Sequence, residues 1–180
     1  MLKRLILSVA LLASSIGFGC SNHVDPAVYA AQTPAFDMRG YFNGTIDAWG
    51  VFQDRSGEVK KRFTVVMKCV WQGDVGSFEE DFAYADGTQQ KRTWTFTRNA
   101  DGSYTGRAPD VVGTATGILS GNALQLRYTL KLPVDGREFE VDFDDWLFQM
   151  DKEVVLNRAQ MSKFGFNLGS LTVSFRKRAG

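Results

Sequence analysis

Short runs of alternating apolar and polar residues, separated by turn signals, fill the chain between Asp37 and Lys177. The clearest run is 124–132, where Leu or Tyr stands at every even position and a polar residue at every odd one. Side chains of a strand point alternately to its two faces, so this period of two predicts a strand with one apolar face. No segment of ten or more residues carries a helical stripe. The domain is therefore expected to be all-β.

Turn signals such as Asp86-Gly87 and Ser120-Gly121-Asn122 divide this region into about ten strands. They are expected near 41–53, 58–72, 77–85, 90–98, 103–108, 111–119, 123–132, 137–149, 153–161 and 166–177. Short turns make sequential strands antiparallel, and one open sheet of this size would leave two long edges exposed. We therefore expect an antiparallel up-and-down barrel of about ten strands, with a two-sheet sandwich as the alternative.

The N-terminus has the features of an export signal. Lys3 and Arg4 precede the apolar run 5–12, which is shorter than the roughly 20 residues that a transmembrane helix needs. Gly19-Cys20 is similar to the cleavage site of a lipoprotein signal, although Gly17 stands where that motif usually has Leu, Val or Ile. A conventional signal peptide cut after Ala30 is the alternative.

We accordingly expect three segments: a signal peptide over 1–19, a tether over 20–36 lipidated at Cys20, and a barrel domain over 37–180. Ser21 after the cysteine favours anchoring in the outer membrane, with the domain in the periplasm. The lipid anchor makes the membrane the first expected partner.

Several functional classes are disfavoured. The net charge of +1 gives no reason to expect a nucleic-acid partner. The single histidine, His23, lies in the expected tether, so catalysis by a Ser-His or Cys-His pair is not expected. No Cys/His cluster predicts a metal site, no glycine-rich loop predicts a phosphate site, and no cofactor is expected. Cys69 alternates with polar residues in an apolar run and is interpreted as a buried apolar residue.

Two charged residues share the apolar face of their strands. Asp145 lies an even number of positions along the chain from Val141 and Phe143, and so does Arg92 from Trp94. Residues spaced in this way lie on the same face of a strand, so both charged side chains should point into the barrel and pair. The candidate site comprises Arg92, Trp94, Asp145, Trp146, Asn157, Arg158 and Lys163. Two interpretations stay open: a buried ion pair that fixes strand register, and polar groups that orient the headgroup of a ligand beneath an aromatic cavity.

Five segments carry a family resemblance: 49–57, 90–94, 106–113, 144–146 and 161–165. On these motifs the chain resembles an uncharacterised bacterial lipoprotein family of unknown function. Its general pattern is also similar to calycin barrels such as lipocalins, and this resemblance implies an interior that holds apolar ligands.

Three functions are consistent with these features. The favoured one is a membrane-anchored protein that binds a lipid or another apolar small molecule inside the barrel. The alternative is a structural or interaction lipoprotein of the cell envelope with a filled barrel, although the sequence identifies no protein partner. An isomerase or cyclase using Arg, Tyr and Asp groups is the least favoured, and no catalytic residue is assigned.

Overall fold

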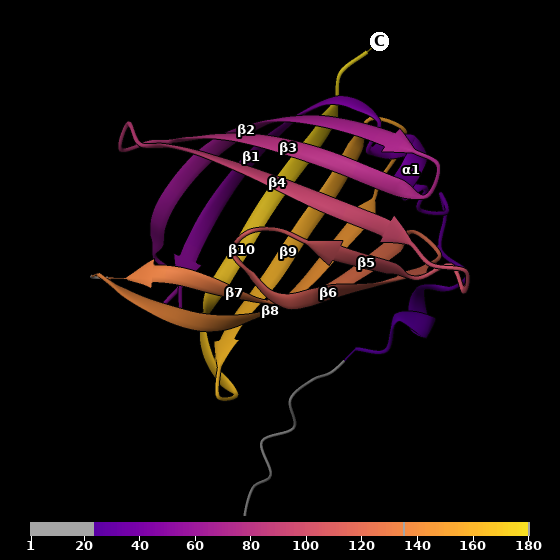
Figure 1. Cartoon of the computed structure of the whole chain (residues 1–180). Helices are drawn as coiled ribbons and strands as arrows, with labels where there is room; N and C mark the ends of the chain where they lie inside the picture. The colour runs from indigo at the N-terminus through magenta and orange to yellow at the C-terminus, as the bar shows by residue number, and fades with distance from the viewer. Residues whose placement is uncertain (1–23, 135, 180) are drawn as a thin grey trace, which may run out of the picture.

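The chain folds into a closed barrel of ten antiparallel strands, in which each strand pairs with the next in sequence and β1 pairs with β10 (Figure 1). The strands are β1 (Gly44–Asp54), β2 (Val59–Gln72), β3 (Val75–Tyr84), β4 (Gln89–Arg98), β5 (Tyr104–Arg107), β6 (Val111–Ser120), β7 (Ala123–Val134), β8 (Arg137–Gln149), β9 (Val154–Lys163) and β10 (Phe166–Lys177). The up-and-down barrel predicted from the sequence is confirmed, and the sandwich is excluded.

This computed structural model describes residues 24–134 and 136–179. The expected signal peptide, the lipidation site Cys20 and the histidine His23 lie outside the described residues. No helix of the described part is long and apolar enough to cross a bilayer.

Turn chemistry sets the strand register. In the β3–β4 hairpin, Gly87 has a φ of +87°, a conformation that glycine adopts without steric cost. The carboxylate of Asp86 accepts a hydrogen bond from the backbone N–H of Thr88 at 2.9 Å. With the turn fixed here, Glu80 on β3 lies directly opposite Arg92 on β4.

The hairpins lie alternately at the two ends of the barrel. We call one the α1 end, because the short helix α1 (Met38–Tyr41) lies there with Met38 and Tyr41 buried. The indole N–H of Trp71 donates to the carbonyl of Phe42 at 2.8 Å and fixes this segment to β2. The far end carries the β1–β2, β3–β4, β5–β6, β7–β8 and β9–β10 turns.

The described part of the segment expected as a tether, 24–36, contacts the barrel. A 3-10 helix, η1 (Pro26–Tyr29), places the ring of Tyr29 at 5.4 Å from Trp146 and 5.3 Å from Phe148, centroid to centroid. Further along, the backbone N–H of Phe36 donates to the carbonyl of Gly121 at 2.7 Å. The first strand begins at Gly44 rather than near 41, because the residues before it form α1.

Candidate functional site

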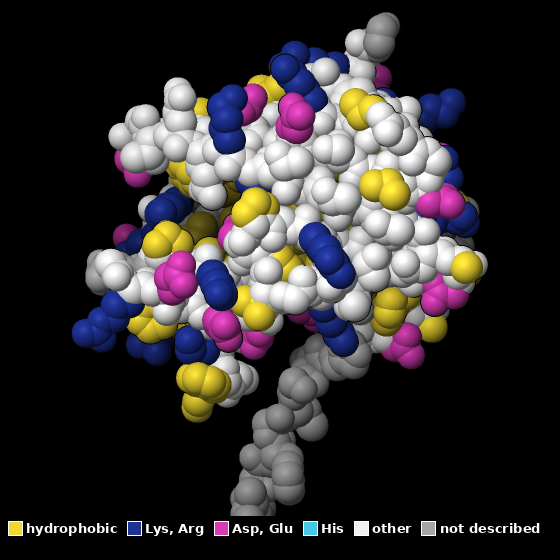
Figure 2. Space-filling view, in the orientation of Figure 1, with side chains coloured by type: hydrophobic (Ala, Val, Ile, Leu, Met, Phe, Trp, Pro, Cys, Tyr) yellow, Lys and Arg dark blue, Asp and Glu magenta, His cyan; other side chains and the backbone are white. Residues whose placement is uncertain are grey.

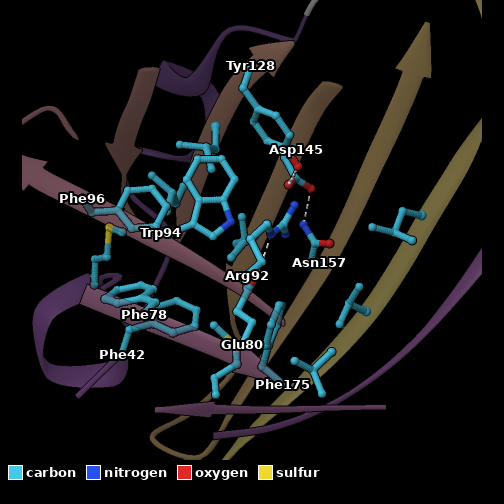
Figure 3. A pocket seen from close by; sticks show the side chains of 18 of the residues that line it. Phe42, Phe78, Glu80, Arg92, Trp94, Phe96, Tyr128, Asp145, Asn157 and Phe175 are labelled. Atoms are coloured by element: carbon cyan, nitrogen blue, oxygen red, sulfur yellow. Dashed lines mark hydrogen bonds and ion pairs between the residues drawn. The ribbon is translucent and has the colours of Figure 1, made fainter. Parts of the chain in front are cut away.

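The barrel contains a cavity of about 120 Å³. Its wall is mostly apolar and includes the rings of Phe42, Phe78, Trp94, Phe96 and Phe175 (Figure 3). Polar side chains also line it, namely Glu80, Arg92, Tyr128, Asp145 and Asn157. Figure 2 shows a hollow near the tips of the β3–β4 and β7–β8 hairpins, with hydrophobic side chains inside and charged side chains of both signs around it.

Arg92 forms ion pairs with two acidic residues. Its Nε donates to Oε2 of Glu80 at 2.8 Å, and Nη1 donates to Oδ2 of Asp110 at 3.3 Å. Asp110 reaches this position because β5 pairs with β4 only over 95–98, so the turn after β5 lies beside Arg92. The guanidinium carbon also lies 5.3 Å from the ring centroid of Trp94. Charge pairing and cation–π contact therefore fix the guanidinium at the cavity wall.

A second polar cluster comes from β7, β8 and β9. The hydroxyl of Tyr128 donates to Oδ2 of Asp145 at 2.8 Å, and Nδ2 of Asn157 donates to Oδ1 at 2.5 Å. Figure 3 shows these side chains converging beside Arg92. Asp145 thus has neutral hydrogen-bond donors on both oxygens while it is almost fully buried.

Burial dominates the electrostatics of the site. It raises the pKa of Asp145 even though Asn157 and Tyr128 donate hydrogen bonds to the carboxylate, which act in the opposite direction. Burial likewise raises the pKa of Glu80, in spite of the neighbouring Arg92. With Asp110 included, three carboxyl groups share this region with the single guanidinium of Arg92. The site therefore has an excess of acidic groups.

The structure separates the sequence-predicted site residues into two groups. Arg92, Trp94, Asp145 and Asn157 line the cavity, and for the first three this was predicted from the alternation of side chains along their strands. Trp146 and Arg158 lie opposite each other on the outer side of β8 and β9, where Trp146 contacts η1 and Arg158 is exposed.

Lys163 lies at the far end, with its ammonium 5.0 Å from the ring centroid of Phe139 and 5.2 Å from that of Phe164. The assignment of Trp146, Arg158 and Lys163 to the site is therefore corrected: the first two follow inward-facing residues on their strands and point outward, and the third closes its strand at the barrel rim.

The expected Arg92–Asp145 ion pair is also wrong. Arg92 pairs with Glu80 and Asp110, because the hairpin register places Glu80 directly across from it. Glu80 and Tyr128 were missed as site residues. Glu80 has the parity of Phe78 and Phe82, and counting outward from the Asp86-Gly87 turn would have placed it opposite Arg92.

Other chemistry has little support in the described residues. Within 24–134 and 136–179, no group of three or more His, Cys, Asp or Glu side chains is arranged to hold a metal ion. Cys69 is buried as predicted, and burial raises the pKa of its thiol to about 12. The thiol is therefore neutral near pH 7 and unsuited to nucleophilic attack.

Comparison with known proteins gives a family and distant structural neighbours. The model of the family described as "Protein of unknown function (DUF3833)" matches residues 15–177. No curated protein matches the chain. A redesigned β-barrel, mFAP1, bound to DFHBI has 10% identity and a TM-score of 0.42, with 78% of this chain and 100% of that chain covered. The S-type phycobiliprotein lyase CPES from Guillardia theta has 4% identity and a TM-score of 0.47, covering 77% of this chain and 89% of that one.

Proposed function

The chain belongs to this family of unknown function, as its motifs indicated, and we propose that it binds a small, largely apolar molecule inside the barrel. One observation carries the proposal: an aromatic-lined cavity of about 120 Å³ with a fixed polar cluster on its wall. Binding sites for small molecules commonly combine apolar walls with a few placed polar groups.

The size of the cavity favours a hollow barrel over a filled one. A single water needs about 10–15 Å³ of comparable space, and the cavity offers about 120 Å³. Much of its wall is aromatic or aliphatic, where water finds few hydrogen-bond partners. An apolar group in this space would gain contact with several rings.

The polar cluster suggests which polar group the ligand carries. Each oxygen of Asp145 already accepts one hydrogen bond, and a carboxylate oxygen can accept a second. The guanidinium of Arg92 already pairs with Glu80 and Asp110, so the acidic groups at this wall outnumber the cation. A ligand with a donor such as an amine or hydroxyl group would complement this wall, whereas a carboxylate would be repelled.

The location of the protein forms part of the proposal. We infer an exported protein anchored in the outer membrane by lipid on Cys20, with its barrel in the periplasm, and the support is the sequence of the leader. Mass spectrometry of the mature N-terminus tests this step. A mature chain that begins at an acylated Cys20 supports the proposal, and an unmodified Cys20 overturns it.

Ligand binding is tested on the full chain with a pair of matched variants. Val173 is buried and lines the cavity, whereas Thr172 beside it is exposed on the outer side of β10. Val173→Phe should fill the cavity, and Thr172→Phe adds the same ring outside. Native mass spectrometry should find a co-purified small molecule on wild type and on Thr172→Phe, and none on Val173→Phe.

Probe titration gives a second readout. We expect 1-naphthylmethylamine and 1-naphthylmethanol to bind about tenfold or more tightly than 1-naphthoic acid, a difference of about 1.4 kcal/mol. Failure of all three probes, together with an empty purified protein, would overturn the proposed function. Equal binding of the amine and the acid would overturn the assigned ligand chemistry alone.

A further inference from the structure

The turn between β9 and β10 presents two phenylalanines to solvent. Phe164 is 84% exposed and Phe166 is 75% exposed, the highest values among the exposed large hydrophobic residues of the described part. In Figure 1 this hairpin, drawn in yellow, projects at the bottom of the view. Exposed aromatic rings at the tip of a hairpin add almost nothing to the barrel core, so their presence needs another explanation.

The backbone at this tip is also unfavourable for the residue it carries. Phe164 has a φ of +52° and is the one non-glycine residue with positive φ in the described part. Glycine and asparagine adopt this conformation readily, whereas a bulky residue there is an outlier. The turn alone would favour Asn or Gly at position 164. Folding therefore does not account for the ring.

The surroundings of the tip combine apolar surface with a cation. The ammonium of Lys163 lies 5.2 Å from the ring centroid of Phe164 and 5.0 Å from that of Phe139. Phe139 is 36% exposed, and Leu168 further along β10 is 37% exposed. A lysine whose stem lies along apolar surface can keep its charged head at the level of lipid phosphates.

We propose that the hairpin tip, residues 163–166, inserts its two phenylalanine rings past the headgroups, to the boundary with the acyl chains, in an anionic phospholipid bilayer. Lys163 would then face the lipid phosphates beside the inserted rings. This contact is independent of the proposed ligand cavity. It would hold the far end of the barrel, where the hollow lies, against the membrane surface.

A bilayer fits this tip better than a folded protein does. Two phenylalanines bury at most about 300–500 Å² together, whereas a standard protein–protein interface buries about 800 Å² on each partner. The apolar surface is concentrated on two adjacent positions of a projecting turn, which lipid headgroups can surround. A second copy of the chain would need a complementary apolar groove of its own.

Depth-dependent quenching tests the proposal in the full chain. Phe164→Trp places a fluorophore at the tip, and the emission of the wild-type chain is subtracted. Vesicles contain phosphatidylethanolamine and phosphatidylglycerol, with or without bromine on the acyl chains. We expect a blue shift of the added emission in both vesicles and loss of most of its intensity in the brominated ones.

The matched control is Val70→Trp, because Val70 is 56% exposed on β2 near the α1 end. Its emission should not change with bromination. An unquenched tip, or equal quenching at positions 70 and 164, overturns the proposal. A blue shift at position 164 that appears without vesicles and grows with protein concentration also overturns it and indicates a second copy as the occupant.

Discussion

Nε of Arg92 donates to Oε2 of Glu80 at 2.8 Å, and the two residues face each other across β3 and β4 on the wall of the cavity. Their side chains are 18% and 10% exposed, so the pair is largely removed from water. Such a pair contributes little net stability, but either charge left alone there is costly. The pair therefore constrains the site more than it stabilises the barrel.

Removal of one member of this pair should be far more damaging than removal of both. We expect Arg92→Met to lower the free energy of unfolding by about 3–5 kcal/mol, because Glu80 is left buried beside an apolar side chain. The double variant Glu80→Leu with Arg92→Met should recover the part of that loss that comes from Glu80, while the partly exposed Asp110 still lacks its cation. Urea denaturation measures both values. Equal losses in the single and double variants would contradict this account.

Stability should fall as the pH rises above the ordinary pKa of an aspartate, about 3.9, because of Asp145. Burial raises its pKa in the folded state. In the pH window between the ordinary pKa and this raised pKa, the folded protein therefore binds more protons than the unfolded chain does. Below the window both states are protonated, and the full contribution is present. Glu80, whose pKa burial also raises, adds a loss of the same sign.

Asp145→Asn removes the first of these two losses and keeps the size of the side chain. Its free energy of unfolding should therefore decrease less than that of wild type between about pH 4 and pH 7. Urea titrations at a series of pH values measure the difference. Parallel pH profiles for the two proteins would show that Asp145 does not titrate as its burial predicts.

Gly121 should be indispensable for docking of the N-terminal segment. It has a φ of +53°, and an added Cβ would lie 1.8 Å from the backbone carbonyl oxygen of Tyr29. Gly121→Ala should therefore displace η1, expose Trp146, and speed proteolysis of residues 24–36. Gly57 is the control, since it has a φ of +88° and no atom lies within 4 Å of the corresponding Cβ. Similar proteolysis of both variants would point to backbone strain alone.

Phe164→Asn should stabilise the barrel. The substitution relieves an unfavourable left-handed conformation, and we expect a gain of about 1 kcal/mol and a higher melting temperature. Phe166→Asn provides the control, because the described backbone places no positive φ at position 166. Calorimetry of the two variants measures the effect. A lower melting temperature for Phe164→Asn would show that the ring supports the fold.

The strands were predictable because each carries the pattern of a half-buried surface. β7 was expected over 123–132 and covers Ala123–Val134, and its apolar even positions face the core. Closure followed from the tight turns, since they leave few topologies other than sequential pairing. The helix α1 escaped prediction because four residues are too few to show a helical period.

The site was only partly predictable. The alternation of side chains correctly placed Arg92 and Asp145 inside the barrel. Trp146 follows Asp145 on β8 and points outward by the same alternation, and Arg158 lies opposite it on β9. The ion-pair partner of Arg92 depends on the register of β3 and β4. The turn between these strands sets that register and brings Glu80 opposite Arg92. The cavity itself had no sequence signal, because large aromatic side chains can either fill a barrel or line a hollow one.

The pairing of β1 with β10 determines when the protein can complete its folding. Ile46 lies opposite Lys177 in this pair, so the ladder joins residues from nearly opposite ends of the domain. During synthesis β1 must wait for the last strand, and until then its edge is open to strands of other chains. Pairing of segments that are distant in sequence is slow, so the pairing of β10 with β1 should limit the folding rate. A chain shortened before β10 would be left as an open, aggregation-prone sheet.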